Sequence, residues 1–130
     1  MNARVKHRPK YLNLVEIKLP LAGFASILHR VSGAGLFLML PVLIWLLDLS
    51  LGSADSFATL KAVTGHALVK LILLGVLWAF LHHFCMGIRI LLIDIHIGVE
   101  KVQARASAMA VMVVSLMLTA ILGAALFLGN

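Results

Sequence analysis

The sequence predicts an all-α integral membrane protein with three transmembrane helices. Of its 130 residues, 62% are hydrophobic and only 12% are charged, and the mean hydropathy is +1.09. A soluble domain has about 45–50% apolar and about 25% charged residues, and a chain of this length has no soluble core large enough to bury the excess. Three apolar runs each reach the roughly 20 residues that a membrane span needs. The composition therefore argues against a soluble enzyme, a disordered tail and a disulfide-stapled secreted domain.

The charge distribution predicts the orientation. The net charge is +6, and five Lys and Arg residues precede Pro20. The first loop, residues 48–64, has one lysine against two aspartates, whereas residues 94–105 again contain a lysine and an arginine. By the positive-inside rule, we expect a cytoplasmic amino terminus. Since no basic helix face is interleaved with aromatic residues, we expect membrane lipid and no nucleic acid as partner. The basic head has no signal-peptide cleavage site, which favours direct insertion into a bacterial inner membrane.

We expect one membrane-anchor domain over residues 1–130. It begins with a cytoplasmic basic head over 1–20, and helices follow at about 21–51, 65–93 and 106–128. These apolar runs are the only segments long enough to span a bilayer.

The first span has a proline in its middle. Pro41 removes one backbone hydrogen bond, so we expect a kink, which membrane helices tolerate. After this span, residues 52–56 (Gly-Ser-Ala-Asp-Ser) predict a turn or loop.

The other two spans differ in polarity. The second has Lys70 near its start and Arg89 near its end, and both side chains are long enough to reach an interface. The single cysteine, Cys85, is expected to be a small buried hydrophobic residue. The third span has no ionisable side chain, and small or weakly polar residues spaced by multiples of four predict close helix packing: Ser107, Ser115, Thr119 and Gly123.

His83 is the strongest candidate for a cofactor ligand. Gly75, Ala79, His83 and Gly87 recur every fourth residue, so they form one shallow groove with a single imidazole at its centre. A flat macrocycle such as haem needs one nitrogen ligand with no bulky side chain a turn away, and imidazole is an axial ligand of haem iron. The alternative is a helix contact in which His83 is hydrogen-bonded to a neighbouring helix.

His82 points about 100° away from His83 on the same helix. Its neighbours four residues away are Trp78 and Met86. We therefore expect a hydrogen-bonded or interface histidine there.

Ser26, His29 and Arg30 share a helix face at the start of the first span. An arginine at the edge of lipid needs an anion, a carbonyl group or water, such as a cofactor carboxylate, a quinone oxygen or a lipid phosphate. Since the first helix starts where the second ends, this face should lie near Arg89 and Asp94, with His83 deeper in the membrane.

Two motifs resemble those of the cytochrome b membrane-anchor subunit of succinate dehydrogenase, as found in bacterial two-subunit anchors. The resemblance covers nearly the whole chain and rests on these segments: Arg8-Pro9, Leu14 and Leu21 leading to residues 26–33 (Ser-Ile-Leu-His-Arg-Val-Ser-Gly), and residues 83–89 (His-Phe-Cys-Met-Gly-Ile-Arg) leading to Asp94.

The resemblance implies a haem site and a quinone site. His83 matches the axial ligand of haem b, whose second ligand belongs to the partner anchor subunit. His29 and Arg30 match residues near the haem propionates. Ser26, Arg30 and Asp94 match residues of the ubiquinone site, where Arg30 would stabilise negative charge on a quinone oxygen and Asp94 would supply a proton.

The resemblance also implies an assembly. The chain would bind a second hydrophobic anchor subunit, an iron–sulfur subunit and a flavoprotein subunit, which alone hold the iron–sulfur clusters and FAD. The chain itself would have no succinate-oxidising site. It departs from the family at Ile90, Ile93 and His96, which leaves no histidine beside Arg89. The alternatives are a fumarate reductase-type anchor using menaquinone and a cofactor-free three-helix membrane subunit.

Overall fold

The structure is a computed structural model that describes residue 13 and residues 16–128. This part of the chain contains no strand and has four α-helices: α1 (Leu21–Leu51), α2 (Ala54–Gly65), α3 (Ala67–Asp94) and α4 (Lys101–Leu128). Three of them, α1, α3 and α4, are long and apolar enough to cross a membrane. The predicted fold class is confirmed.

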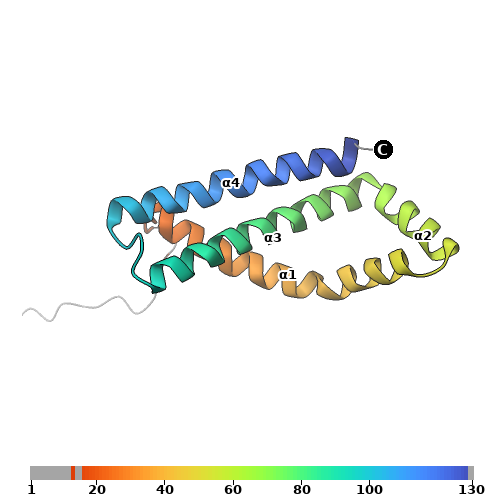
Figure 1. The fold of residues 1–130 in the computed structure, drawn as a ribbon, viewed down its shortest axis with the longest axis horizontal. Coiled ribbons are helices and arrows are strands. Elements are labelled where there is room, and N and C mark those ends of the chain that lie inside the picture. Colours follow the sequence, from red (N-terminus) through yellow and green to blue (C-terminus); the bar gives the residue numbers. More distant parts are fainter. Residues whose placement is uncertain (1–12, 14–15, 129–130) are drawn as a thin grey trace, which may run out of the picture.

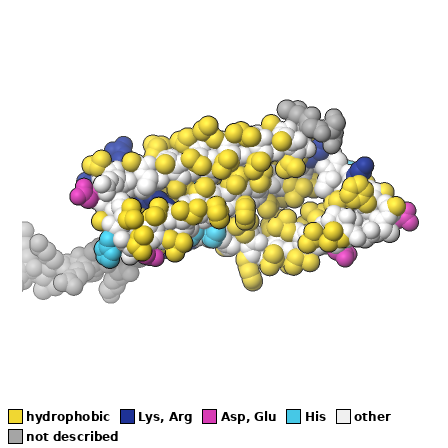
Figure 2. Space-filling model, in the orientation of Figure 1, with side chains coloured by type: hydrophobic (Ala, Val, Ile, Leu, Met, Phe, Trp, Pro, Cys, Tyr) yellow, Lys and Arg dark blue, Asp and Glu magenta, His cyan; other side chains and the backbone are white. Residues whose placement is uncertain are grey.

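Helix α3 is the centre of the bundle and packs against both α1 and α4. The start of α1, the end of α3 and the start of α4 meet at one end, on the left of Figure 1, which we call the site end. The end of α1, α2, the start of α3 and the end of α4 lie at the opposite end, which we call the α2 end. Hydrophobic side chains cover the visible face between them, and charged side chains gather mainly towards the two ends (Figure 2).

Helix α1 has the predicted bounds and follows Pro20, whose extended backbone (φ −65°, ψ 155°) precedes the first helical turn. Pro41 lies inside the helix, and α1 changes direction along its length in Figure 1. This agrees with the expected kink, because the proline ring removes one hydrogen bond without ending the helix.

The predicted loop over residues 48–64 is wrong. Residues 48–51 belong to α1, and residues 54–65 form α2. The hydroxyl oxygen of Ser53 caps α2 by accepting a hydrogen bond from the Ser56 backbone N–H at 3.2 Å. Asp55 in the first turn adds a favourable charge at the amino-terminal end of the helix. Ser53 was therefore the local signal for a helix that hydropathy does not reveal.

The remaining boundaries differ modestly from the prediction. Helix α3 begins at Ala67 instead of residue 65, and α4 begins at Lys101 instead of residue 106. Four of the first five residues of α4 are Lys, Gln, Ala and Arg, so hydropathy excludes this turn, yet these four residue types are good helix formers. Between α3 and α4 the chain turns through two positive φ angles, at His96 (64°) and Gly98 (76°).

The apolar core is small and lies towards the site end. Its fully or nearly buried members come from all three spans: Ala25, Met86, Ala108 and Val111. Cys85 packs against them as expected, but it is half-buried instead of buried. Most other large apolar side chains are exposed, which suits a protein whose surroundings are lipid.

The small-residue ridge of α4 packs as predicted. Ser115 is fully buried and Thr119 is 8% exposed. Their hydroxyl groups donate to backbone carbonyls of α4 itself, at 3.1 and 2.7 Å. A Cβ atom on Gly123 would be 2.6 Å from a side-chain carbon of Leu74. Glycine at this position therefore lets α4 approach α3.

Candidate functional site

The His83 side chain of α3 lies against α1 and is hydrogen-bonded to it. Its Nδ1 is 3.0 Å from the backbone oxygen of His29 and 3.3 Å from Oγ of Ser32. The Ser32 hydroxyl donates to the same His29 oxygen at 2.9 Å, so its own lone pairs can accept from His83. Because a carbonyl oxygen only accepts hydrogen bonds, Nδ1 carries the proton. In the neutral ring, Nε2 is then the unprotonated nitrogen.

The surroundings fix the plane of the His83 ring. The His29 ring stacks on it, with 4.1 Å between ring centroids and 16° between planes. On the α1 backbone, a Cβ atom at Gly33 would be only 2.8 Å from Cε1 of His83. The ring therefore occupies space that only a glycine at position 33 leaves free.

The predicted groove is open on both sides of His83 along α3. A Cβ atom at Gly75 or Gly87 would meet nothing within 4 Å. His83 is half-buried. Its Nε2 has no hydrogen bond within the described part of the chain, and this atom is accessible at the surface. The hydrogen bond to a neighbouring helix, which the alternative interpretation predicted for His83, therefore exists. It involves Nδ1 alone and leaves the second ring nitrogen accessible.

These features fit an axial ligand of a haem. A metal-binding imidazole usually donates its other N–H to a carbonyl or carboxylate, which sets the tautomer and the ring orientation. His83 has this arrangement, with the His29 carbonyl as the acceptor. In the part of the chain that the structure describes, no three His, Cys, Asp or Glu side chains gather as a metal site. The site thus offers one imidazole beside open, small-residue surface, as a planar cofactor requires.

His82 faces the opposite way, into the bundle. It is 0% exposed, and neither ring nitrogen has a hydrogen-bond partner; the same is true of Nε1 of Trp78. The two rings stack with 5.3 Å between centroids. Of the two expected alternatives, a hydrogen-bonded or an interface histidine, the structure shows the interface position. Because its ring has no exposed surface, His82 cannot bind a group from outside the bundle.

Ser26, Arg30 and Asp94 lie at the site end but make no contacts with one another. Ser26 is half-buried beside the core residue Ala25, whereas Arg30 and Asp94 are exposed. Among the described residues, no hydrogen bond or ion pair joins these three side chains. Their polar groups are therefore available to a ligand or to another subunit.

Arg89 shares this end but is directed towards α4. It is 8% exposed, its Nε donates to Oγ of Ser107 at 2.9 Å, and one terminal nitrogen donates to the Ala104 oxygen at 3.1 Å. The expectation that it reaches an interface is wrong, because these acceptors on α4 satisfy it inside the bundle. Ser107 was the sequence signal, since it faces α3 from the first turns of α4.

The first part of the amino-terminal motif, at Arg8, Pro9 and Leu14, lies outside the described residues. Residues 1–12 carry most of the basic head, so the structure describes only Lys18 among its cations.

Comparisons with known proteins agree with this geometry. Residues 4–122 match the family model described as succinate dehydrogenase/fumarate reductase transmembrane subunit. A protein of Coxiella burnetii named succinate dehydrogenase cytochrome b556 subunit is 38% identical over 116 residues, which cover 88% of this chain and 90% of that protein. Proteins with the same name are 33% identical in Paracoccus denitrificans, over 86% of both chains, and 32% identical in Rickettsia felis, over 88% of this chain and 90% of the relative.

The family match covers nearly all of the chain, including the first two spans, most of the third and the segment that holds His29 and His83. The chain therefore belongs to the family of succinate dehydrogenase/fumarate reductase transmembrane subunits.

Proposed function

We propose that this chain is the haem-binding membrane anchor of a succinate dehydrogenase, and that Nε2 of His83 is one of the two axial ligands of a haem b. The second ligand would come from a partner anchor subunit. The observation that carries the proposal is the hydrogen bond from Nδ1 of His83 to the His29 carbonyl, beside accessible Nε2. The relatives named cytochrome b556 subunits support it.

The residues around His83 hold the ligand in position. The His29 carbonyl and the Ser32 hydroxyl hold the proton on Nδ1 and fix the orientation of the ring. The His29 ring covers one face of the imidazole. A haem with two imidazole ligands supplies one-electron transfer and has no open position for oxygen.

Ser26, Arg30 and Asp94 are proposed to form this chain's part of a ubiquinone site. Arg30 is an exposed cation at the end of a span, so it can donate to a quinone oxygen and stabilise the negative charge that develops there. The Ser26 hydroxyl can donate to the same ligand, and the exposed Asp94 carboxyl can exchange protons with water. The absence of contacts among the three supports a site completed by other subunits.

The chain is a multi-pass protein of a bacterial inner membrane. We propose that its partners are a second hydrophobic anchor, an iron–sulfur subunit and a flavoprotein subunit, and that FAD, the iron–sulfur clusters and succinate oxidation belong to the last two. Arg30 and His29 would also lie beside the haem propionates, because a guanidinium pairs well with a carboxylate.

The test is a reduced-minus-oxidised optical spectrum of the purified complex with His83→Leu, beside wild type and His82→Leu. The His83 variant should lose the haem b bands while the partner chains remain in the complex. His82→Leu is the matched control, and it should keep the bands because its ring does not reach the surface. Retained bands in the His83 variant would refute the ligand assignment.

The matched family also includes fumarate reductase subunits. Succinate oxidation is favoured because the relatives compared here are named for it. Extraction of quinone from the host membrane decides the question: ubiquinone supports succinate oxidation, and menaquinone alone would favour fumarate reduction.

A further inference from the structure

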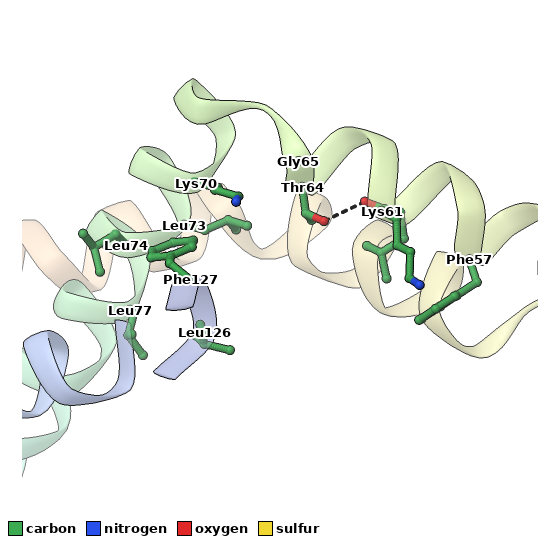
Figure 3. Close-up of a pocket in the computed structure, with 11 residues that line it drawn as sticks. Phe57, Lys61, Thr64, Gly65, Lys70, Leu73, Leu74, Leu77, Leu126 and Phe127 are labelled. Atoms are coloured by element: carbon green, nitrogen blue, oxygen red, sulfur yellow. Dashed lines mark hydrogen bonds between the residues drawn. The ribbon is translucent and has the colours of Figure 1, made fainter. Parts of the chain in front are cut away.

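A cavity of about 550 Å³ lies at the α2 end, on the opposite side of the membrane span from His83. Helices α2, α3 and the end of α4 surround it (Figure 3). Five leucines line it, and Phe57 of α2 and Phe127 of α4 add two aromatic rings. The proposed haem and quinone residues lie at the other end, so the cavity is independent of them.

Among the described residues, two lysines are the only charged ones in this wall. Lys61 comes from α2 and Lys70 from α3. The ammonium group of Lys61 is 5.2 Å from the centre of the Phe57 ring, and that of Lys70 is 5.6 Å from the centre of the Phe127 ring. In Figure 3 the Lys70 side chain extends from α3 towards α2, and Lys61 lies beside Phe57 on the facing helix.

Neither lysine is neutralised by the described part of the protein. No ion pair involves them there, and no aspartate or glutamate lines the cavity. An aromatic face attracts a cation but leaves its full positive charge in place. The cavity therefore combines an apolar wall with two cations that need an anion.

The cavity lies at one end of the membrane-spanning helices, which is where the headgroups of the surrounding lipids lie. It lies where α3 begins and α4 ends, and lysines near the ends of spans extend towards the interface. Beyond Lys70 along α3, Leu73, Leu74 and Leu77 give the cavity an apolar wall. A ligand with an anionic head and apolar chains matches both parts, whereas a partner helix would have to bring unpaired acidic side chains into the membrane.

We propose that this cavity is a binding site for one anionic glycerophospholipid. Lys61 and Lys70 bind the phosphate-bearing headgroup, and the leucines and Phe127 contact an acyl chain.

Phosphatidylglycerol is the probe, and the delipidated whole complex in neutral detergent is the protein. Native mass spectrometry counts the bound lipid during a titration. Lys61→Gln combined with Lys70→Gln should weaken the tightest phosphatidylglycerol site by about 30-fold, since each lysine near an anionic lipid is worth about a fivefold factor. Lys18→Gln combined with Lys101→Gln removes the same charge at the site end and should change this site less than twofold.

A second variant tests the shape of the cavity with both lysines intact. Gly65 lines the cavity, and a Cβ atom there would meet nothing within 4 Å. Gly65→Leu should therefore fill part of the space and weaken phosphatidylglycerol binding severalfold.

Three results would overturn the proposal. One is equal phosphatidylglycerol affinity in wild type and in the double lysine variant. Another is equally tight binding of zwitterionic phosphatidylcholine. The third is loss of the partner anchor from the complex of the double lysine variant, because the cavity would then be a contact between subunits.

Discussion

At the scale of single residues, Gly33 determines how closely the His83 ring can approach α1. Alanine there would place its Cβ 2.8 Å from Cε1 of His83, so we expect the ring to move and haem content to fall about tenfold, as for other supporting residues of metal ligands. The pyridine haemochrome assay measures this. Gly35→Ala is the control, because its Cβ meets nothing within 4 Å and alanine favours a helix. Equal haem content in the two variants would contradict the assigned contact.

The buried His82 side chain should lower the stability of the protein, and this effect can be measured. Its two buried ring nitrogens have no partner, and an unsatisfied buried polar group costs about 1–3 kcal/mol. Leucine removes both groups, so His82→Leu should raise the free energy of unfolding by about 1 kcal/mol and the melting temperature of the purified complex by a few degrees. A lower melting temperature would show that the assembled complex gives His82 a partner.

At the scale of elements, Arg89 links α3 to α4. Lysine cannot make both of the bonds that Arg89 makes to Ser107 and to the Ala104 carbonyl. Hydrogen bonds from a charged group contribute about 1.5–3 kcal/mol each, so Arg89→Lys should lower the free energy of unfolding by about 2 kcal/mol. Thermal unfolding of the complex measures this. Arg105→Lys, an exposed position on α4, should have no effect, and equal melting temperatures of the two variants would refute the role of Arg89.

The helix boundaries show what hydropathy can and cannot find. Helix α1 agrees with its predicted range because Pro20 precedes its first residue and a long apolar run occupies most of its length. Helix α2 and the first turns of α4 were missed because they lie outside the apolar runs. Their helical signals are local: the Ser53 cap in one case and a run of good helix formers in the other. His96 has a positive φ of 64°, a backbone conformation that a Cβ atom makes unfavourable and that hydropathy does not predict.

At the scale of the whole molecule, the bundle has two chemically different ends, and their orientation can be tested. The positive-inside rule predicts that the site end faces the cytoplasm. In a Cys85→Ala background, Ser53→Cys at the α2 end should react with a membrane-impermeant maleimide in intact spheroplasts. Val99→Cys at the site end should react only after permeabilisation. Both positions are exposed, so the reverse pattern would show the opposite orientation.

By itself, the sequence determined the class of the protein, its three spans, the end at which the polar site residues lie and the choice of His83 over His82. These conclusions follow from composition and helical periodicity, because lipid requires long apolar segments whose backbone polar groups are satisfied within the helix. The spacing of small residues located the open groove along α3, because residues four apart lie on the same face of a helix.

Only the tertiary structure decided which atoms meet. The His29 carbonyl and the Ser32 hydroxyl reach Nδ1 of His83 from another helix, and neither contact is encoded in the local sequence around His83. The inward direction of Arg89 likewise depends on Ser107 and Ala104 of α4. Such contacts depend on the rotation and depth of each helix relative to its neighbours, which periodicity along a single helix does not specify.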